Sequence, residues 1–150
     1  MKYIWIVLSL FYSILVWAGP TNTANVRDGV LLYGYDPVSY FSATKPVKGK
    51  AEIKATVDGQ NYLFSNEENR KLFVANPKKY QPQYEGWCAT AVAKGFKYDI
   101  DPENFKITDG KLYLFYKGWK GDAKKDWVKD EAGNIKTADQ NWPKVKTTEE

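Results

Sequence analysis

The sequence contains no histidine, and it contains one cysteine and one methionine among its 150 residues. Histidine is the commonest general base near neutral pH and the commonest metal ligand. A catalytic site in this chain would have to use carboxylates, tyrosines or lysines, and no pair of these stands out. One cysteine cannot form a disulfide within the chain, so the fold must depend on its hydrophobic core. These absences predict that the protein is not an enzyme.

Other common signatures are also missing from the sequence. It has no Ser-His-Asp set, no phosphate-binding glycine loop and no Cys-x-x-Cys pair. The formal net charge is +4, but the lysines are scattered along the chain rather than gathered in a stripe. We therefore expect no nucleic-acid binding. The 6 Trp, 11 Tyr and 7 Phe residues supply material for a large core, and they could also line an apolar ligand pocket.

The long hydrophobic run of the sequence lies at its start. Lys2 precedes an almost unbroken apolar stretch over residues 3–16, and the small residues Ala18 and Gly19 follow. This order is typical of a cleaved export signal. An uncleaved anchor is the alternative, although the run is short for a membrane span of about 20 residues. We expect residues 1–18 to be a signal peptide, and the exported protein to be periplasmic or secreted without a stable membrane anchor.

The rest of the chain has the length of one domain. Residues 19–32 are small and polar, which indicates a flexible lead-in. Residues 33–144 carry the hydrophobic and turn patterns of a folded domain, and residues 145–150 indicate a disordered tail.

Two similar segments, TVDGQNYLF at 56–64 and ITDGKLYLF at 107–115, place Asp-Gly between β-favouring residues. Asp-Gly in this setting is the strongest short signal for a two-residue hairpin, because a type I′ turn needs positive φ at both central residues. The segments therefore predict two hairpins, which pair residues 51–57 with 60–65 and residues 105–108 with 111–116.

Helix signals separate and follow the predicted strands. Asp36 is a suitable N-cap, and Pro37 follows it at the first helical position. The apolar stretch after Gly86 predicts a buried helix that ends at Gly95, a natural C′ residue.

Two helices are expected near the end of the chain, one over residues 123–129 and one that begins at Asn134 and stops at Pro143. Together the patterns predict an α+β fold, in which a small antiparallel sheet built from β-hairpins is covered by short helices.

Cys88 is the residue with the most distinctive chemistry. Its place in the first turn of the expected helix would favour a thiolate, and hence a reactive thiol or a soft-metal ligand. Ala91 and Val92 share its helix face, and no histidine, lysine or arginine lies near it in sequence. A buried structural cysteine is the favoured interpretation. An unpaired cysteine in an exported protein could also join a second chain.

Acidic residues alternate in the stretch YDIDPENF, at Asp99, Asp101 and Glu103. Such carboxylates can bind a hard cation such as Ca²⁺, but the glycine and closing glutamate of an EF-hand loop are missing at the required offsets. Asp101 precedes a proline, which is ordinary turn chemistry, and we favour a turn at this place.

The runs GYDPVSYF, VDGQNYLFSNEENRKLFVANPKKYQPQYEGWCATAVAKG, DGKLYLFY and ADQNWPK occur in this order and cover about residues 33–144. In this order they resemble the YHS-domain family, and in particular its exported, stand-alone branch. The resemblance implies a metal-binding relative, with copper as the candidate metal. The family's cysteine positions correspond here to Ser39, Ser65 and Asn69. Their side chains are poor ligands for Cu(I), so the resemblance also implies that this metal site is lost.

Three functions are left open by the sequence. The leading expectation is an exported, non-enzymatic module that binds an unidentified small ligand or protein partner. The first alternative is a periplasmic copper-binding protein that uses Cys88, and the second is a thiol redox protein.

Overall fold

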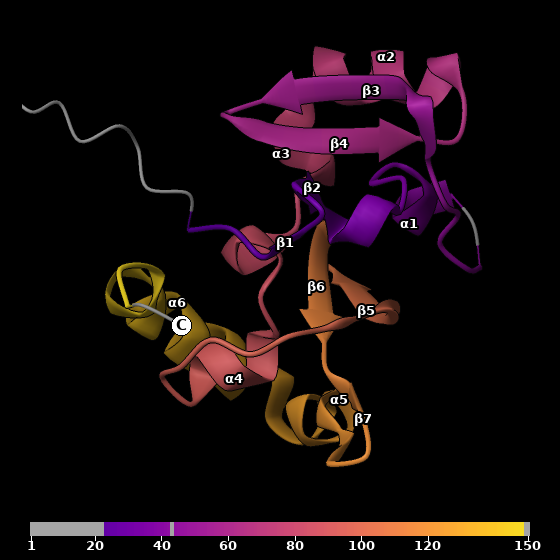
Figure 1. Ribbon diagram of the computed structural model, residues 1–150. Coiled ribbons are helices and arrows are strands. Elements are labelled where there is room, and N and C mark those ends of the chain that lie inside the picture. Colours follow the sequence, from indigo (N-terminus) through magenta and orange to yellow (C-terminus); the bar gives the residue numbers. More distant parts are fainter. Residues whose placement is uncertain (1–22, 43, 149–150) are drawn as a thin grey trace, which may run out of the picture.

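The computed structural model describes residues 23–42 and 44–148, and it confirms the predicted α+β class (Figure 1). The strands form three small sheets rather than one. The largest sheet has the strand order β1-β2-β4-β3, and the other two are hairpins. Between these strands all pairings are antiparallel except a single parallel register between β2 and β4, and an isolated parallel bridge joins Pro82 to Leu112. The strands are β1 (Val26–Arg27), β2 (Val30–Leu31), β3 (Lys50–Val57), β4 (Gln60–Phe64), β5 (Asp101–Thr108), β6 (Lys111–Phe115), β7 (Lys117–Gly118) and β8 (Gly121–Asp122).

Short helices surround these sheets, and the longest of them ends the described chain. Among the described residues no helix has the length and hydropathy needed to cross a membrane. The α-helices are α1 (Ser39–Ser42), α2 (Glu67–Ala75), α3 (Pro77–Tyr80), α4 (Ala89–Ala93), α5 (Ala123–Trp127) and α6 (Glu131–Lys146), and the 3₁₀ turns are η1 (Leu32–Gly34), η2 (Gln83–Gly86) and η3 (Val128–Asp130).

Both predicted hairpins are present. Asp58 and Gly59 have φ of 52° and 75°, and Asp109 and Gly110 have φ of 52° and 71°, as a type I′ turn requires. Strand β5 begins at Asp101, four residues earlier than expected, and its register shifts between Asp101 and Phe105. The Asp101 carboxylate accepts a hydrogen bond from the Glu103 N–H at 2.9 Å. The expected turn is therefore a local irregularity within a strand.

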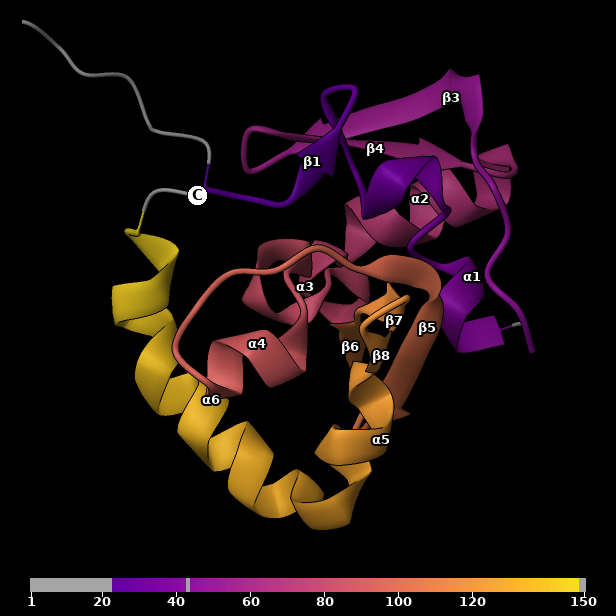
Figure 2. The same ribbon diagram turned by 60° about the horizontal axis from the view of Figure 1, so that its bottom comes forward.

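Strand β6 lies between two hydrophobic cores, and its side chains alternate between them. Leu112 and Leu114 belong to the first core, which the β3–β4 hairpin, α1, α2 and α3 complete. Tyr113 and Phe115 belong to the second core, where they contact Trp127 with ring centroids 5.4 and 5.5 Å apart. Figures 1 and 2 show the β5–β6 hairpin between the upper layer of β3, β4 and α2 and the helices α4, α5 and α6.

The segment before residue 33 is part of the fold, so the domain begins earlier than predicted. Asn25 is buried, and its side chain donates to the Gly86 carbonyl at 3.1 Å and lies 3.0 Å from the Tyr33 hydroxyl. Asn25 thereby joins two left-handed turns, at residues 32–34 and 84–86, whose residues all have φ between 50° and 84°. Non-glycine residues rarely adopt this conformation, so these contacts hold strained backbone in place. The predicted signal peptide at residues 1–18 lies outside the described residues.

The chain end also differs from the prediction. Helix α6 begins at Glu131, Asp130 caps it at the Gly133 N–H, and the helix continues through Pro143. The predicted start at Asn134 and stop at Pro143 are therefore wrong. Val145 is 2% exposed and packs in the second core, so the expected disordered tail is wrong for residues 145–148. Burial of Val145 compensates for the hydrogen bond that proline removes from the helix.

Two further boundaries were expected near Cys88. Helix α4 begins at Ala89, later than predicted, because Gly86 has φ of 84° and ends the preceding left-handed turn. Gly95 has φ of 90° directly after the helix cap, which confirms it as the C′ residue.

Helix α2 is capped by Asn66, whose side-chain oxygen accepts from the Asn69 N–H at 2.8 Å.

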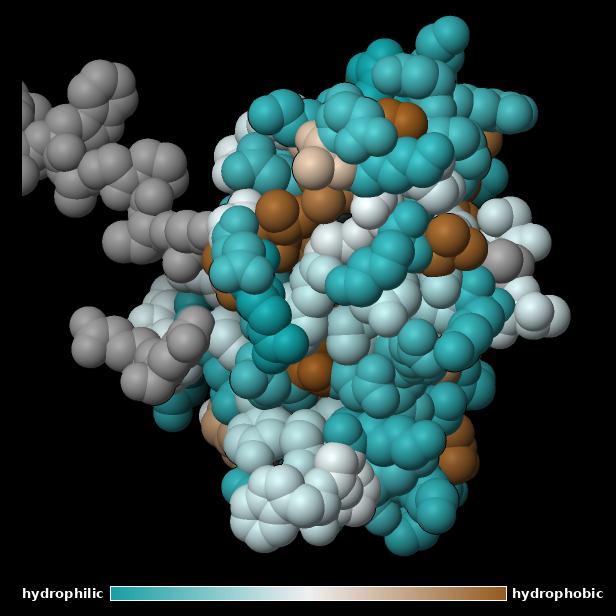
Figure 3. Space-filling view, turned by 45° about the vertical axis from the view of Figure 1, so that its right-hand side comes forward, coloured by the Kyte–Doolittle hydropathy of each residue, from teal (hydrophilic) through white to brown (hydrophobic). Residues whose placement is uncertain are grey.

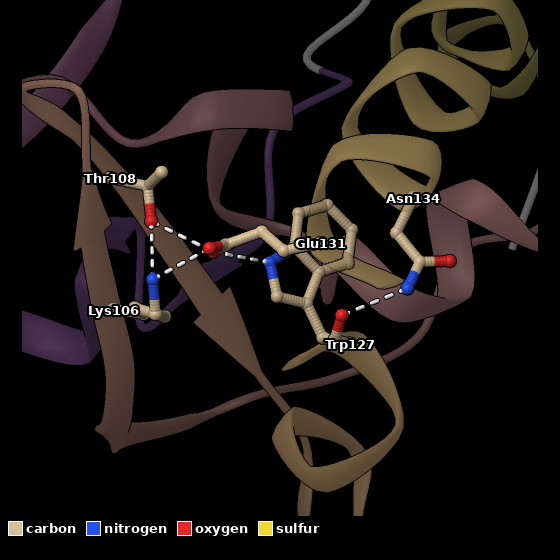
Figure 4. Close-up of polar contacts among 5 residues, drawn as sticks. All are labelled: Lys106, Thr108, Trp127, Glu131 and Asn134. Atoms are coloured by element: carbon tan, nitrogen blue, oxygen red, sulfur yellow. Dashed lines mark hydrogen bonds and ion pairs between the residues drawn. The ribbon is translucent and has the colours of Figure 1, made fainter. Parts of the chain in front are cut away.

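A polar network attaches α6 to the β5–β6 hairpin (Figure 4). Glu131 accepts hydrogen bonds from Lys106 Nζ at 2.7 Å, Thr108 Oγ1 at 2.8 Å and Trp127 Nε1 at 3.0 Å. Asn134 Nδ2 donates to the Trp127 carbonyl at 2.9 Å. Burial alone would raise the pKa of Glu131, but the donors outweigh it and lower the pKa below its ordinary value. Charged Glu131 is therefore the form that the fold stabilises.

Replacement of Glu131 by Gln is expected to destabilise the protein by about 1–3 kcal/mol at pH 7, because the amide nitrogen cannot accept from the surrounding donors. A lowered pKa stabilises the fold above the ordinary pKa, and this contribution is lost as the pH falls through the folded-state pKa. The difference between wild type and E131Q should therefore shrink between pH 7 and pH 3.5 in urea unfolding. Glu67→Gln, at an exposed ion pair, serves as the control. An equal difference at both pH values would contradict the prediction.

Candidate functional site

The residues at the three cysteine positions of the resemblance surround one buried carboxylate. Asp36 is fully buried, and its Oδ2 accepts from the Ser65 N–H at 2.8 Å, Ser65 Oγ at 2.6 Å and Asn69 Nδ2 at 2.7 Å. Its Oδ1 accepts from the Val38 N–H at 2.9 Å. Asp36 is therefore the connection between the start of α1 and the end of β4.

Ser39 lies on the backbone side of the same cluster. Its Oγ donates to the Asp36 carbonyl at 2.7 Å and accepts from the Val47 N–H at 2.9 Å. The structure thus brings Ser39, Ser65 and Asn69 together around Asp36, each with hydrogen-bonding partners in the protein. Pro37 was expected at the first helical position, but α1 begins at Ser39 and Pro37 lies in the turn before it. The Asp36 carboxylate closes this turn by accepting from the Val38 N–H. These hydrogen bonds join the segments around Asp36 and stabilise the local fold.

Cys88 lies directly before α4, and its side chain is buried with 1% of the residue surface exposed. Its sulfur accepts a hydrogen bond from the Tyr116 N–H at 3.3 Å, and its own N–H donates to the Tyr98 carbonyl at 3.0 Å. Burial raises the pKa of the Cys88 thiol, and backbone donors, including the Tyr116 N–H, offset part of this effect. The expected burial is confirmed. A neutral, enclosed thiol is a poor nucleophile, which argues against the thiol redox alternative.

A pocket of about 310 Å³ opens beside this cysteine. Its apolar walls are Phe96, Tyr98, Tyr116, Ala91 and Ala123. The rings of Tyr98 and Tyr116 meet edge to face with centroids 5.1 Å apart, and Phe96 meets Tyr98 at 6.4 Å. Because Cys88 exposes so little surface, these aromatic side chains form the surface that a ligand would touch. The volume is at the lower end of the range for small-molecule sites.

The rim of this pocket carries charges of both signs, and they differ in their partners. Asp122 accepts from Asn104 Nδ2 at 2.8 Å, and Asp126 pairs with Lys129 at 2.7 Å. Lys94 and Lys120 form no ion pair with any described residue. The Lys120 ammonium lies 4.9 Å from the Tyr98 ring centroid instead. Lys129, followed by the Lys94 charge, lowers the pKa of Asp126, and the Tyr98 hydroxyl raises the pKa of Lys120. Neither Lys94 nor Lys120 has a carboxylate within ion-pair distance, so both can approach the acidic group of a ligand.

The alternating acids of the sequence do not form a cation site. Asp99 accepts from the Tyr33 hydroxyl at 2.8 Å, Asp101 accepts from the Glu103 N–H at 2.9 Å, and the Glu103 carboxylate pairs with Lys45 at 2.8 Å. Burial, followed by hydrogen bonding to Asp99, raises the pKa of Tyr33 to about 12. Among the described residues, no group of three or more His, Cys, Asp or Glu side chains could hold a metal ion.

Comparison of the chain with family models, with curated proteins and with solved structures finds no match. The resemblance to YHS-domain proteins therefore stays a prediction from the motifs, as do export and copper binding.

Sequence reasoning found Cys88 but missed the residues that make its pocket. Tyr98, Tyr116, Lys94 and Lys120 come from separate segments, and none of these segments carries a recognisable motif. The local pattern KGWKG at 117–121 was the available signal, because it places an aromatic residue and two lysines on a tight glycine turn.

Asp36→Asn is expected to destabilise the protein by roughly 3 kcal/mol or more, because the new amide nitrogen faces donors that it cannot accept from. Thermal and urea unfolding measure this loss. Asp58→Asn is the matched control, since asparagine suits the left-handed conformation of that exposed turn. Equal stability of the two variants would show that the Asp36 cluster does not hold the fold.

The Cys88 thiol is expected to react at least about a hundredfold more slowly with a disulfide reagent at pH 7.5 in the folded protein than in urea, because reaction requires local opening. Absorbance of the released thiolate gives the rate. Comparable rates in both states would contradict the burial and revive the redox alternative.

Proposed function

We propose that this protein is a non-enzymatic binding module for a small amphipathic anion, with an apolar or aromatic body and one acidic group. The observation that carries the proposal is the aromatic pocket beside Cys88, whose rim holds Lys94 and Lys120 with no carboxylate within ion-pair distance of either ammonium. The aromatic rings suit the body of such a ligand, and the lysines suit its acidic group.

Size and chemistry support this ligand class over the other candidates. A pocket of about 310 Å³ fits a molecule of one or two fused rings rather than a polymer. Cys88 is buried, and no described acidic cluster or second cysteine accompanies it, so no observation favours copper capture. The proposal keeps the leading sequence expectation of a binding module and adds the class of ligand.

Fluorescence titration with 8-anilinonaphthalene-1-sulfonate tests the proposal. This probe has an aromatic body, made of a naphthalene and a phenyl ring, and one sulfonate group. We expect saturable binding of one molecule per chain, with a dissociation constant of the order of tens of micromolar. Lys94→Ala combined with Lys120→Ala should weaken binding by roughly three- to tenfold, since each exposed ion pair contributes up to about 1 kcal/mol.

Phe96→Ala should also weaken binding, whereas Leu72→Ala should not, although the two side chains are similarly exposed, at 46% and 44%. Cys88→Ala should leave the affinity within about twofold, because the thiol offers little surface. If the lysine and Phe96 variants bind the probe as tightly as wild type, this pocket is not the binding site.

A further inference from the structure

A second pocket, of about 530 Å³, lies on the other side of the Tyr98–Tyr116 pair. Trp87, Lys97, Lys117 and Trp119 line it, together with the same two tyrosines. Because Tyr98 and Tyr116 also line the first pocket, the two hollows belong to one continuous face. We call this surface the hairpin face, since the β7–β8 hairpin lies at its centre.

Trp119 projects from the tip of this hairpin and is 89% exposed, the highest value among the exposed large hydrophobic side chains of the described chain. The hairpin packs closely on Tyr116, because a Cβ at Gly118 would clash with the Tyr116 hydroxyl oxygen. The Lys120 N–H also points at that oxygen, at 3.3 Å. Glycine at 118 thus lets the turn rest on Tyr116, and the indole next to it extends into solvent.

Four lysines line the two pockets of this face, namely Lys94, Lys97, Lys117 and Lys120. None of them forms an ion pair with a described residue, and the Lys97 ammonium donates to the Thr148 carbonyl at 2.7 Å. Lys120 Nζ lies 5.1 Å from the Trp119 ring centroid, and Lys97 Nζ lies 5.4 Å from that of Trp87. Aromatic faces thus accompany lysines that have no acidic partner.

The acids of the hairpin face are already engaged. Asp99 lies 2.8 Å from the Tyr33 hydroxyl, Asp122 is hydrogen-bonded to Asn104, and Asp126 pairs with Lys129. The residues that line the two pockets include four lysines and three aspartates, so the net charge of this face is positive. Its charge complements an anionic surface.

We propose that the hairpin face docks on the surface of a membrane that contains anionic lipids. Tryptophan is enriched where membrane meets water, because its ring is apolar and its N–H is polar. Lysines next to it are attracted to anionic headgroups. A projecting side chain such as Trp119 can insert between lipid headgroups, whereas a protein partner would need a cavity that matches the shape of the indole. Figure 3 shows hydrophobic residues in small separate patches on one side of the molecule.

Sedimentation of the full chain with vesicles tests this docking, with phosphatidylcholine alone compared with a 3:1 mixture of phosphatidylcholine and phosphatidylglycerol. Wild type should partition more strongly into the anionic vesicles, and raised salt should remove the difference. Lys117→Ala with Lys120→Ala should lower partitioning into anionic vesicles by about 30-fold, at about 1 kcal/mol for each lysine. Trp119→Ala should lower it by roughly tenfold, as expected when about a third of an indole is buried.

Control variants come from the other end of the molecule, where β3 and α2 lie (Figure 1). Lys50→Ala with Lys54→Ala and Leu72→Ala change exposed residues there and should bind like wild type. All variants keep residues 1–22, so any contribution of that segment is equal in every sample. Equal binding by the hairpin-face variants and wild type would overturn the proposal. Binding to heparin or an acidic protein without binding to anionic vesicles would overturn it as well.

Discussion

The alternation of side chains along β6 is the constraint on which the rest of the structure depends. Leucines at 112 and 114 point into one core, and the aromatic Tyr113 and Phe115 point into the other. A slip of one residue would exchange leucine for aromatic rings on both sides, so the register is strongly specified. The type I′ turn at Asp109-Gly110 fixes the same register locally. Local turn chemistry and long-range packing therefore agree.

Both pockets follow from this register. Tyr116 comes directly after β6, and its partly buried ring packs against the first core and forms a wall shared by the two hollows. Its N–H binds the Cys88 sulfur, which places the end of the strand against the start of α4. The single cysteine acts as a packing residue and a hydrogen-bond acceptor, and the surrounding tyrosines and lysines provide the chemistry that a ligand would meet.

Structural features that depend on only a few adjacent residues could be predicted from the sequence. The two Asp-Gly hairpins and the C′ glycine at 95 are local, and the structure confirms them. Features that depend on distant packing could not be predicted. Pro143 is an ordinary helix stop by local rules, but Val145 is buried against a core formed by other segments, and the helix continues. Asn25 lies in a polar stretch typical of a loose terminus, and only its buried partners show its role.

Only part of the candidate site could be predicted from the sequence. Cys88 stood out because it is the only cysteine, and its burial followed from its apolar neighbours. The sequence does not show that Asp122 and Asp126 bond to other side chains while Lys94 and Lys120 form no ion pair with a described residue. These interactions depend on where the side chains lie in three dimensions. A sequence with evenly scattered charges can therefore still present one cationic face.

The hydrogen bonds that Thr23 and Asn25 make with residues 86 and 87 have a consequence for folding during translation. Asn25 donates to a carbonyl 61 residues further along, and the Thr23 carbonyl accepts from an indole 64 residues further along. A nascent polypeptide emerges amino end first, so β1 waits without these partners until more than half of the chain has been translated. The hairpin at 50–64 pairs residues that are close in sequence, whereas the terminus that precedes it is completed only after residues 86 and 87 have been translated.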